Sequence, residues 1–307
     1  MKRAGIVTVV PGGVLIAGLG ALLAAVLTMC SLSLGQSTGQ PAAQTPPAGQ
    51  AAPAAGQAAA PAGKRPPKVN SQDEFTAYKA AAALTDATAL EKAADDFAAK
   101  YPDSELRPLL YRTTMQRYQL ANNGDRMLEM AKKVLAIDPD DPEALVGVAQ
   151  VLAERTRDTD LDRDQRLAES KKDAERALVT VDTDIPTSGY PPEQLASYKG
   201  FLRSEAYAVL GKLSSDAKNW PEAEANLRKS IDAFPQQVDP IAVLRLAVAL
   251  DMQNKVPEAL KYADQAVDLT KDRPDSGAGK AARDEKDRLT KLNVGTAPGP
   301  TATPLKN

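Results

Sequence analysis

Apolar residues recur at helical spacing through most of the chain, and short polar breaks interrupt the pattern at regular intervals. No stretch shows the strict alternation that is typical of a half-buried strand. The pattern predicts five pairs of helices and one final helix. The pairs cover 71–100, 105–137, 142–181, 192–235 and 239–271, and the final helix covers 276–292.

Several predicted helices begin with recognisable start signals. Ser71 followed by Glu74 has the form of a capping box, in which each residue satisfies a backbone N–H of the other. Asp141 and Asp239 each precede a proline, which combines an N-cap side chain with a residue suited to the first helical position. These signals place helix starts near residues 72, 142 and 240.

A repeat with an offset of 36 residues runs through the C-terminal half of the chain. Trp220-Pro221-Glu222-Ala223 matches Val256-Pro257-Glu258-Ala259, and Leu210-Gly211 matches Leu246-Ala247 on the preceding helices. A small residue at this second position lets two antiparallel helices approach closely. Such a period indicates a stack of similar helix pairs.

These residues resemble the tetratricopeptide repeat (TPR) family, which places a large apolar residue and Gly on the first helix of each repeat and Ala, an aromatic residue, Ala and Pro on the second. The residues that carry the resemblance are Leu210, Gly211, Trp220, Ala223, Leu227, Ser230 and Pro235, followed by Leu246, Ala247, Leu250, Ala259, Ala263, Ala266 and Val267. The resemblance implies an all-α, right-handed α-solenoid of about five TPR-like helix pairs. The charged final helix would cap the end of the solenoid.

The first 35 residues have the composition of an export segment. Lys2 and Arg3 precede a long charge-free apolar stretch, as in a secretory signal or a membrane anchor. Three fates remain open: cleavage after Gly35, retention as an anchor, and lipidation at Cys30, where the preceding residues form an imperfect lipobox. Each fate exports the rest of the chain across the inner membrane, so we expect a periplasmic protein that contacts the membrane only through this segment.

Residues 36–69 are mostly Ala, Pro, Gln and Gly, and we expect a disordered linker there because such a segment buries too little apolar surface to fold. The helical repeat domain should span 70–293, and the Pro/Thr/Gly-rich residues 294–307 should form a disordered tail.

Composition excludes several kinds of chemistry. The chain has no histidine and one cysteine, which rules out Ser-His-Asp and Cys-His nucleophile systems and Cys/His zinc sites. We find no phosphate-binding glycine loop and expect neither an enzyme nor a cofactor. All 40 acidic residues follow residue 70, whereas five of the 38 basic residues precede it, so the repeat domain is net acidic and we expect no nucleic-acid binding.

A concave groove lined by the first helix of each pair would be the binding surface of such an array. The alignment places eleven candidate residues in this groove: Arg112, Gln116, Gln119, Gln150, Glu154, Lys212, Asp216, Ile241, Leu244, Val248 and Asp251. Together they would make a mixed surface, apolar at its C-terminal end, that suits an extended peptide or a partner helix. The alternative is that these are ordinary helix-surface and core residues.

One acidic run resembles a calcium-binding loop. Asp158, Asp160, Asp162 and Glu169 stand at ligand positions of the twelve-residue spacing, but Arg163 occupies the position that requires Gly. The alternative is a solvated loop in which Asp160 caps a helix starting at residue 161.

Export segment, linker and solenoid together predict an exported protein–protein interaction scaffold of the bacterial cell envelope. Its partner is a protein or peptide that the sequence does not identify. The alternative is a structural envelope protein that assembles with itself and has no peptide ligand.

Overall fold

The computed structural model describes residues 63–186 and 190–296, which contain eleven α-helices and no β-strand. The helices are α2 (Gln72–Ala82), α3 (Ala87–Lys100), α4 (Arg107–Leu120), α5 (Gly124–Ile137), α6 (Pro142–Arg155), α7 (Arg163–Thr180), α8 (Pro192–Asp216), α9 (Trp220–Ala233), α10 (Pro240–Asp251), α11 (Val256–Leu269) and α12 (Gly277–Thr296). The five predicted helix pairs and the final helix are confirmed.

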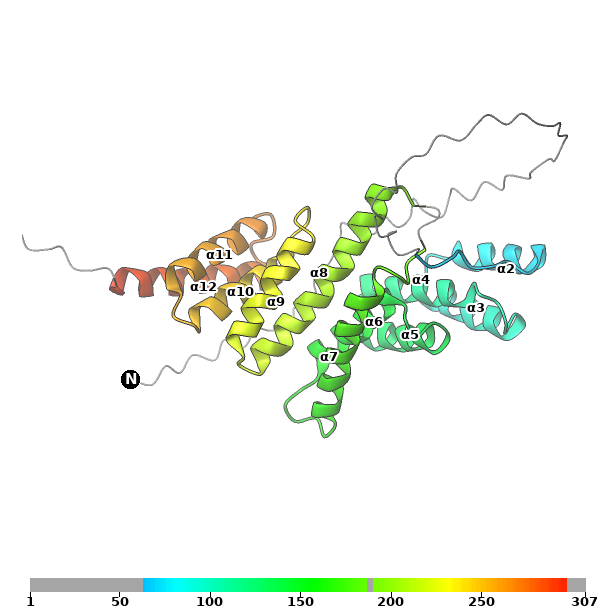
Figure 1. The fold of residues 1–307 in the computed structure, drawn as a ribbon, viewed down its shortest axis with the longest axis horizontal. Helices are drawn as coiled ribbons and strands as arrows, with labels where there is room; N and C mark the ends of the chain where they lie inside the picture. The colour runs from blue at the N-terminus through cyan, green and yellow to red at the C-terminus, as the bar shows by residue number, and fades with distance from the viewer. Residues whose placement is uncertain (1–62, 187–189, 297–307) are drawn as a thin grey trace, which may run out of the picture.

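The helices lie side by side in chain order and form an elongated array from α2 to α12 (Figure 1). Each helix packs against the next, and first helices of successive pairs also touch, as α6 does with α8 and α8 with α10. This is the arrangement of an α-solenoid, in which each repeat contacts mainly its neighbours.

The predicted start signals act as expected. The Ser71 hydroxyl accepts a hydrogen bond from the Glu74 N–H at 3.1 Å, and the Glu74 carboxylate accepts one from the Ser71 N–H at 3.2 Å. Asp141 and Asp239 cap α6 and α10, and the proline after each is the first helical residue. Local sequence therefore determines where these helices begin.

The turn between the two helices of a pair has the same geometry in three of the pairs. Asn122, Lys218 and Asn254 adopt positive φ angles of 54°, 57° and 61°. In each case the N–H of the next residue reaches the carbonyl of the residue five positions before it, at 2.9, 2.8 and 3.0 Å. This is the Schellman motif, which satisfies the last carbonyls of the first helix and turns the chain back.

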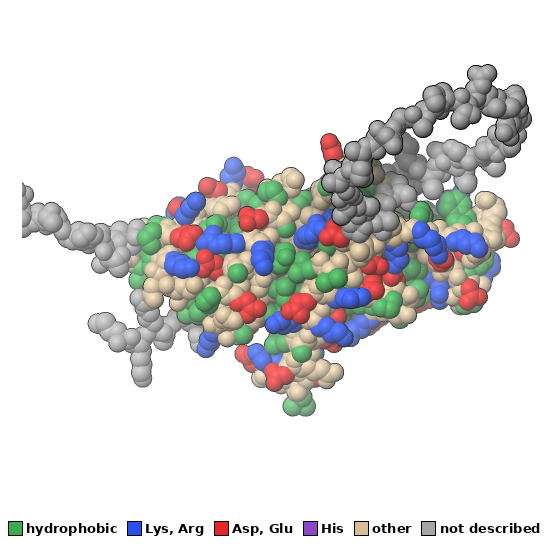
Figure 2. Space-filling model, viewed as in Figure 1, with side chains coloured by type: hydrophobic (Ala, Val, Ile, Leu, Met, Phe, Trp, Pro, Cys, Tyr) green, Lys and Arg blue, Asp and Glu red, His purple; other side chains and the backbone are tan. Residues whose placement is uncertain are grey.

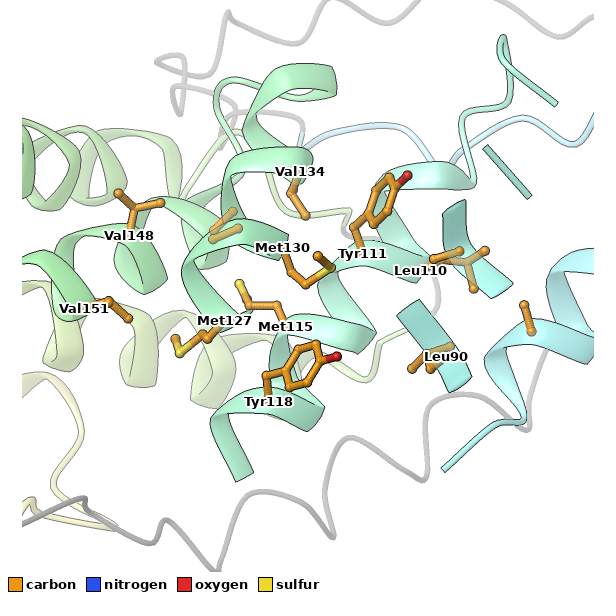
Figure 3. Packing of buried hydrophobic residues seen from close by; sticks show 14 of the residues in the cluster. Leu90, Leu110, Tyr111, Met115, Tyr118, Met127, Met130, Val134, Val148 and Val151 are labelled. Atoms are coloured by element: carbon orange, nitrogen blue, oxygen red, sulfur yellow. The ribbon is translucent and has the colours of Figure 1, made fainter. Parts of the chain in front are cut away.

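The core of the N-terminal half joins α2 to α6. Leu90, Leu110, Met115, Met130 and other apolar side chains interdigitate there, with little or no solvent exposure (Figure 3). A second cluster joins α9 to α12 and is made largely of alanine and leucine. Small side chains allow the helices of this half to pack closely, which compensates for the low aromatic content.

Gly211 shows this close approach most clearly. A Cβ atom placed on Gly211 in α8 would lie 2.6 Å from Cγ of Leu227 in α9. Carbon atoms pack at about 3.5–4.0 Å, so no larger residue fits without a shift of the fully buried Leu227. The small residue predicted at this position is therefore required by the packing.

Some helix ends lie one or two residues inside the predicted ranges, as at Arg107 and Leu269, and two other boundaries differ for a local reason. Helix α7 starts at Arg163 instead of 161, and Asp160 does not cap it, because the Asp160 carboxylate accepts a hydrogen bond from the N–H of Arg157 within the preceding turn. Helix α12 continues past 292 to Thr296, and the first proline that opposes helix comes only at Pro298.

The predicted export segment 1–35, most of the linker 36–69 and most of the tail 294–307 lie outside the described residues. The described end of the linker contacts the array: Lys64 binds Asp138 at 2.5 Å, and Arg65 binds Glu105 at 2.6 Å. Within residues 63–186 and 190–296, none of the helices combines the length and apolar character needed to cross a membrane.

Candidate functional site

A groove of about 370 Å³ opens along the array between the second and the fifth helix pairs. Its walls come from the end of α4, the C-terminal half of α6, the middle of α8 and the start of α10, with the turn after α11 at one end. Most of these are first helices of their pairs, as expected for the inner surface of a solenoid.

Helix α8 contributes the longest wall. Phe201, Glu205, Ala208 and Lys212 follow one another at spacings of three or four residues, which places them on one side of the helix, and all four line the groove. This helix has 25 residues, whereas its neighbours α6 and α9 have 14 each. A 14-residue helix that ended at Asp216 would begin at residue 203, so the extra length of α8 is what brings Phe201 into the wall.

Three carboxylates meet in the groove. Burial, together with the nearby Asp239 and Glu154 carboxylates, raises the pKa of Glu205 to about 8, and a hydrogen bond from the Gln150 amide only partly opposes this. Burial also raises the pKa of Asp239, whose carboxylate accepts hydrogen bonds from two backbone N–H groups at the start of α10. The pKa of Glu154, at the rim of the groove, is also raised, because the effect of burial exceeds the opposing effects of Arg245 and Lys212.

The groove also has an apolar part. Phe201 meets Phe234 edge to face with 5.9 Å between ring centroids, and Val238 and Ile241 lie beside them in the lining. Phe234 is buried, while Phe201, Val238 and Ile241 are half-buried and offer apolar surface to an incoming group. The groove thus combines acidic, neutral amide and apolar surfaces.

The structure brings five of the eleven candidate groove residues together. These are Gln119, Gln150, Glu154, Lys212 and Ile241. The other six lie outside the lining of the groove.

Two of those six belong to a network that joins helix pairs. Arg112 of α4 forms an ion pair with Asp141, and Gln116 donates a hydrogen bond to Glu143 at 2.6 Å. Tyr198 of α8 also donates a hydrogen bond to Glu143, at 2.5 Å. Burial raises the pKa of Glu143. These contacts join α4, α6 and α8, so Arg112 and Gln116 bind other helices of the array and do not line the groove.

The remaining four are divided between core and surface. Leu244 is buried in a cluster with α11 and α12, and Asp251 is buried and pairs with Arg288 of α12 at 2.8 Å. Val248 is half-buried, and Asp216 is exposed and pairs with Lys212 at 2.6 Å. Helix α12 covers this end of α10, so the apolar C-terminal end of the predicted groove is core instead of open surface.

The acidic loop before α7 does not gather its carboxylates at one point. Asp158 pairs with Arg163 at 3.1 Å, and Glu169 lies 3.7 Å from a lysine of α5. Asp160 binds the backbone of its own loop, and Asp162 stands at the N-cap position of α7 without a side-chain capping bond. In the part of the chain that the structure describes, no group of three or more His, Cys, Asp or Glu side chains is arranged to hold a metal ion.

Sequence reasoning missed Glu205, Asp239 as a groove residue, Arg245 and Phe201. It placed the groove only on the C-terminal half of α8, at Lys212 and Asp216. The spacing of Phe201, Glu205 and Lys212 was the available signal, since it puts all three on the surface that carries Lys212.

Comparison with known proteins was made with sequence and with structure. The sequence matches no family model and no curated protein. Among solved structures, the chain is similar to a thermophilic TPR protein of Thermus thermophilus, at 13% identity and a TM-score of 0.42 over 72% of this chain and 99% of that one. It is also similar to the assembly chaperone of RpL4 (Acl4), at 13% identity and a TM-score of 0.38 over 74% of this chain and 99% of that one.

The helix-pair packing, the recurrent turn between helices and the 36-residue repeat of small and large core positions therefore define the fold. The described chain is a TPR-like α-solenoid of five helix pairs closed by a terminal helix.

Proposed function

We propose that this protein is an exported scaffold that binds another protein through the groove between α4, α6, α8 and α10. The observation that carries the proposal is the groove itself: an open, concave surface of mixed polarity on an array of repeats that is otherwise closely packed. Extended surfaces of this kind are what helical solenoids use to bind peptides and partner helices.

The composition supports binding instead of catalysis or nucleic-acid recognition. A chain without histidine lacks the commonest general base. On the face shown in Figure 2, Lys and Arg side chains are interspersed with Asp and Glu along the whole array, without the continuous basic surface that a phosphate backbone requires.

Export and envelope location form the second part of the proposal. They rest on the charged and apolar pattern of residues 1–35 and on the Ala/Pro-rich residues that follow. The segment would tether the array to the membrane or be removed after export. Protease added to intact spheroplasts should digest the repeat domain; full protection until the cells are lysed would refute the envelope location.

The binding role is tested by crosslinking full-length protein in its native cells, purifying it and identifying the attached proteins by mass spectrometry. A variant with Ala208→Trp fills the groove, because Ala208 lines it on α8. Ala225→Trp adds the same side chain at an exposed position of α9 outside the groove. We expect one or two proteins to be enriched with the wild type and with Ala225→Trp, and lost with Ala208→Trp.

Two results would count against the groove. Recovery of the same partner with Ala208→Trp would move the binding surface elsewhere. Recovery of only the protein itself, together with a mass by light scattering that grows with concentration, would support a self-assembling structural protein instead.

A further inference from the structure

The carboxylates of the groove differ from the buried carboxylates elsewhere in the array. Four of the latter are each paired with Arg: Glu91 with Arg126, Asp141 with Arg112, and both Asp251 and Glu285 with Arg288. The fifth, Glu74, accepts hydrogen bonds from the backbone N–H groups of Asn70 and Ser71. A buried carboxylate is costly unless other groups compensate its charge, and each of these five has either a cation or two backbone N–H donors.

Glu205, which is half-buried, and Glu154, which is exposed at the edge of the groove, have fewer partners than these five. Among the described residues, Glu205 accepts a hydrogen bond only from the neutral amide of Gln150, and Glu154 has neither a hydrogen bond nor an ion pair within 4.0 Å. Asp239 uses its carboxylate to cap α10. The three carboxylates therefore face an open groove without a cation bound to any of them.

The cations around the groove do not compensate for this. Lys212 is bound to Asp216 at 2.6 Å, and Arg155 is bound to Asp125 at 2.6 Å, so both are held by carboxylates outside the lining. Arg245 and Arg273 also line the groove, and neither has an ion pair within 4.0 Å among the described residues. Arg245 interacts with all three groove carboxylates at longer range. The nearby charges disfavour the ionised form of Glu205, since Asp239 and Glu154 raise the pKa of its carboxyl group more than Arg245 lowers it.

We propose that the groove binds an extended segment of a partner protein that carries a Lys or Arg side chain, which lies between Glu154 and Glu205, next to an apolar side chain that packs against Phe201 and Ile241. The inference rests on the binding role proposed above and specifies its ligand. No cation is bound to the groove carboxylates, and apolar surface lies beside them. A basic residue flanked by an apolar one therefore complements both the acidic and the apolar part of the groove.

The test uses a phage-displayed library of random dodecapeptides selected on immobilised full-length protein. The double variant Glu154→Gln/Glu205→Gln removes two groove carboxyl groups and keeps the side-chain shapes. Glu193→Gln removes one charge from an exposed position at the start of α8, outside the groove, and serves as the control.

We expect peptides selected on the wild type and on Glu193→Gln to be enriched in Lys and Arg adjacent to Leu, Ile or Phe. A synthetic consensus peptide should bind the wild type at least about tenfold more tightly than the double variant, because loss of a desolvated charge pair weakens binding at an interface by this much or more. Added salt should weaken binding to the wild type.

Enrichment of neutral or acidic peptides, no enrichment at all, or equal affinity for the double variant would each overturn the inference. These results leave the binding role itself intact if a cellular partner is still captured by the wild type and lost with Ala208→Trp. If that capture also fails, the proposed function and the choice of ligand fail together.

Discussion

Replacing Gly211 with alanine tests the packing that the repeat pattern implies. The new Cβ would lie 2.6 Å from Cγ and 2.7 Å from Cδ2 of Leu227, whose side chain is fully buried. Overpacking of this kind costs about 1–3 kcal/mol, whereas alanine in a helix gains about 1 kcal/mol over glycine. Gly277→Ala is the matched control, because nothing lies within 4 Å of a Cβ placed at Gly277.

We therefore expect Gly211→Ala to be about 1–3 kcal/mol less stable to unfolding than Gly277→Ala. Urea denaturation of the full-length variants, followed by far-ultraviolet circular dichroism, measures the difference; an unchanged m-value shows that the same transition is being compared. Equal stability of the two alanine variants would refute the packing argument.

A double variant sharpens this test. The positions 36 residues after Gly211 and Leu227 are Ala247 and Ala263, both fully buried, so the chain itself contains an alanine pair at the equivalent place. Leu227→Ala alone should cost about 2–5 kcal/mol. In combination with Gly211→Ala, the loss should be smaller than the sum of the two single losses by about 1 kcal/mol or more, and strict additivity would contradict a direct contact.

Four further variants, one of them a control, test other parts of the structure. Glu205→Gln should be more stable than the wild type by about 1–3 kcal/mol at pH 9 and nearly equal to it at pH 5, because the pKa of Glu205 is raised from 4.5 to about 8 in the folded state. Arg112→Met should lose about 3–5 kcal/mol, since it leaves the buried Asp141 unpaired, whereas Lys92→Met, which removes an exposed ion pair, should lose far less. Lys218→Gly should gain about 1 kcal/mol, because Lys218 has a φ of 57°. Urea denaturation at the stated pH, or at pH 7 for the last three variants, measures each difference.

The sign of the pH effect follows from linkage. The folded state holds the Glu205 proton more tightly than the unfolded chain does, so wild-type stability falls as the pH rises between 4.5 and about 8. A stability gap that is the same at pH 5 and pH 9 would show that Glu205 is not desolvated. Equal losses of stability for Arg112→Met and Lys92→Met would show that the buried Arg112–Asp141 pair does not stabilise the fold more than an exposed pair. A Lys218→Gly variant less stable than the wild type would argue against backbone strain at that turn.

Much of the fold could be predicted because its signals are local. A cap such as Ser71 or Asp239 acts on backbone groups two or three residues away, and a proline at the helix start acts on its own residue. The 36-residue repeat added the pairing of helices, since Gly211 and Ala247 mark the same contact in successive units. The incorrect start predicted for α7 also has a local cause, because the Asp160 carboxylate accepts a hydrogen bond from the N–H of Arg157 instead of one from the helix.

The site was predicted less completely, because exposure of a helix-surface residue depends on the elements that pack over it. Arg112 and Asp251 have the spacing of groove residues, but Asp141 and Arg288, which are distant in the chain, pair with them inside the array. Glu205 was missed for the converse reason: only the packing of α6 and α10 against α8 shows that its carboxylate is enclosed without a cation.

The sequence alone thus determined the helices, their pairing and their order, since these depend on contacts within a pair or between neighbouring pairs. The tertiary structure decided which polar side chains are used to join repeats and which face an open groove. That distinction depends on how three or four successive pairs stack, and on polar side chains that come together from positions more than 50 residues apart, as Gln150 and Glu205 do.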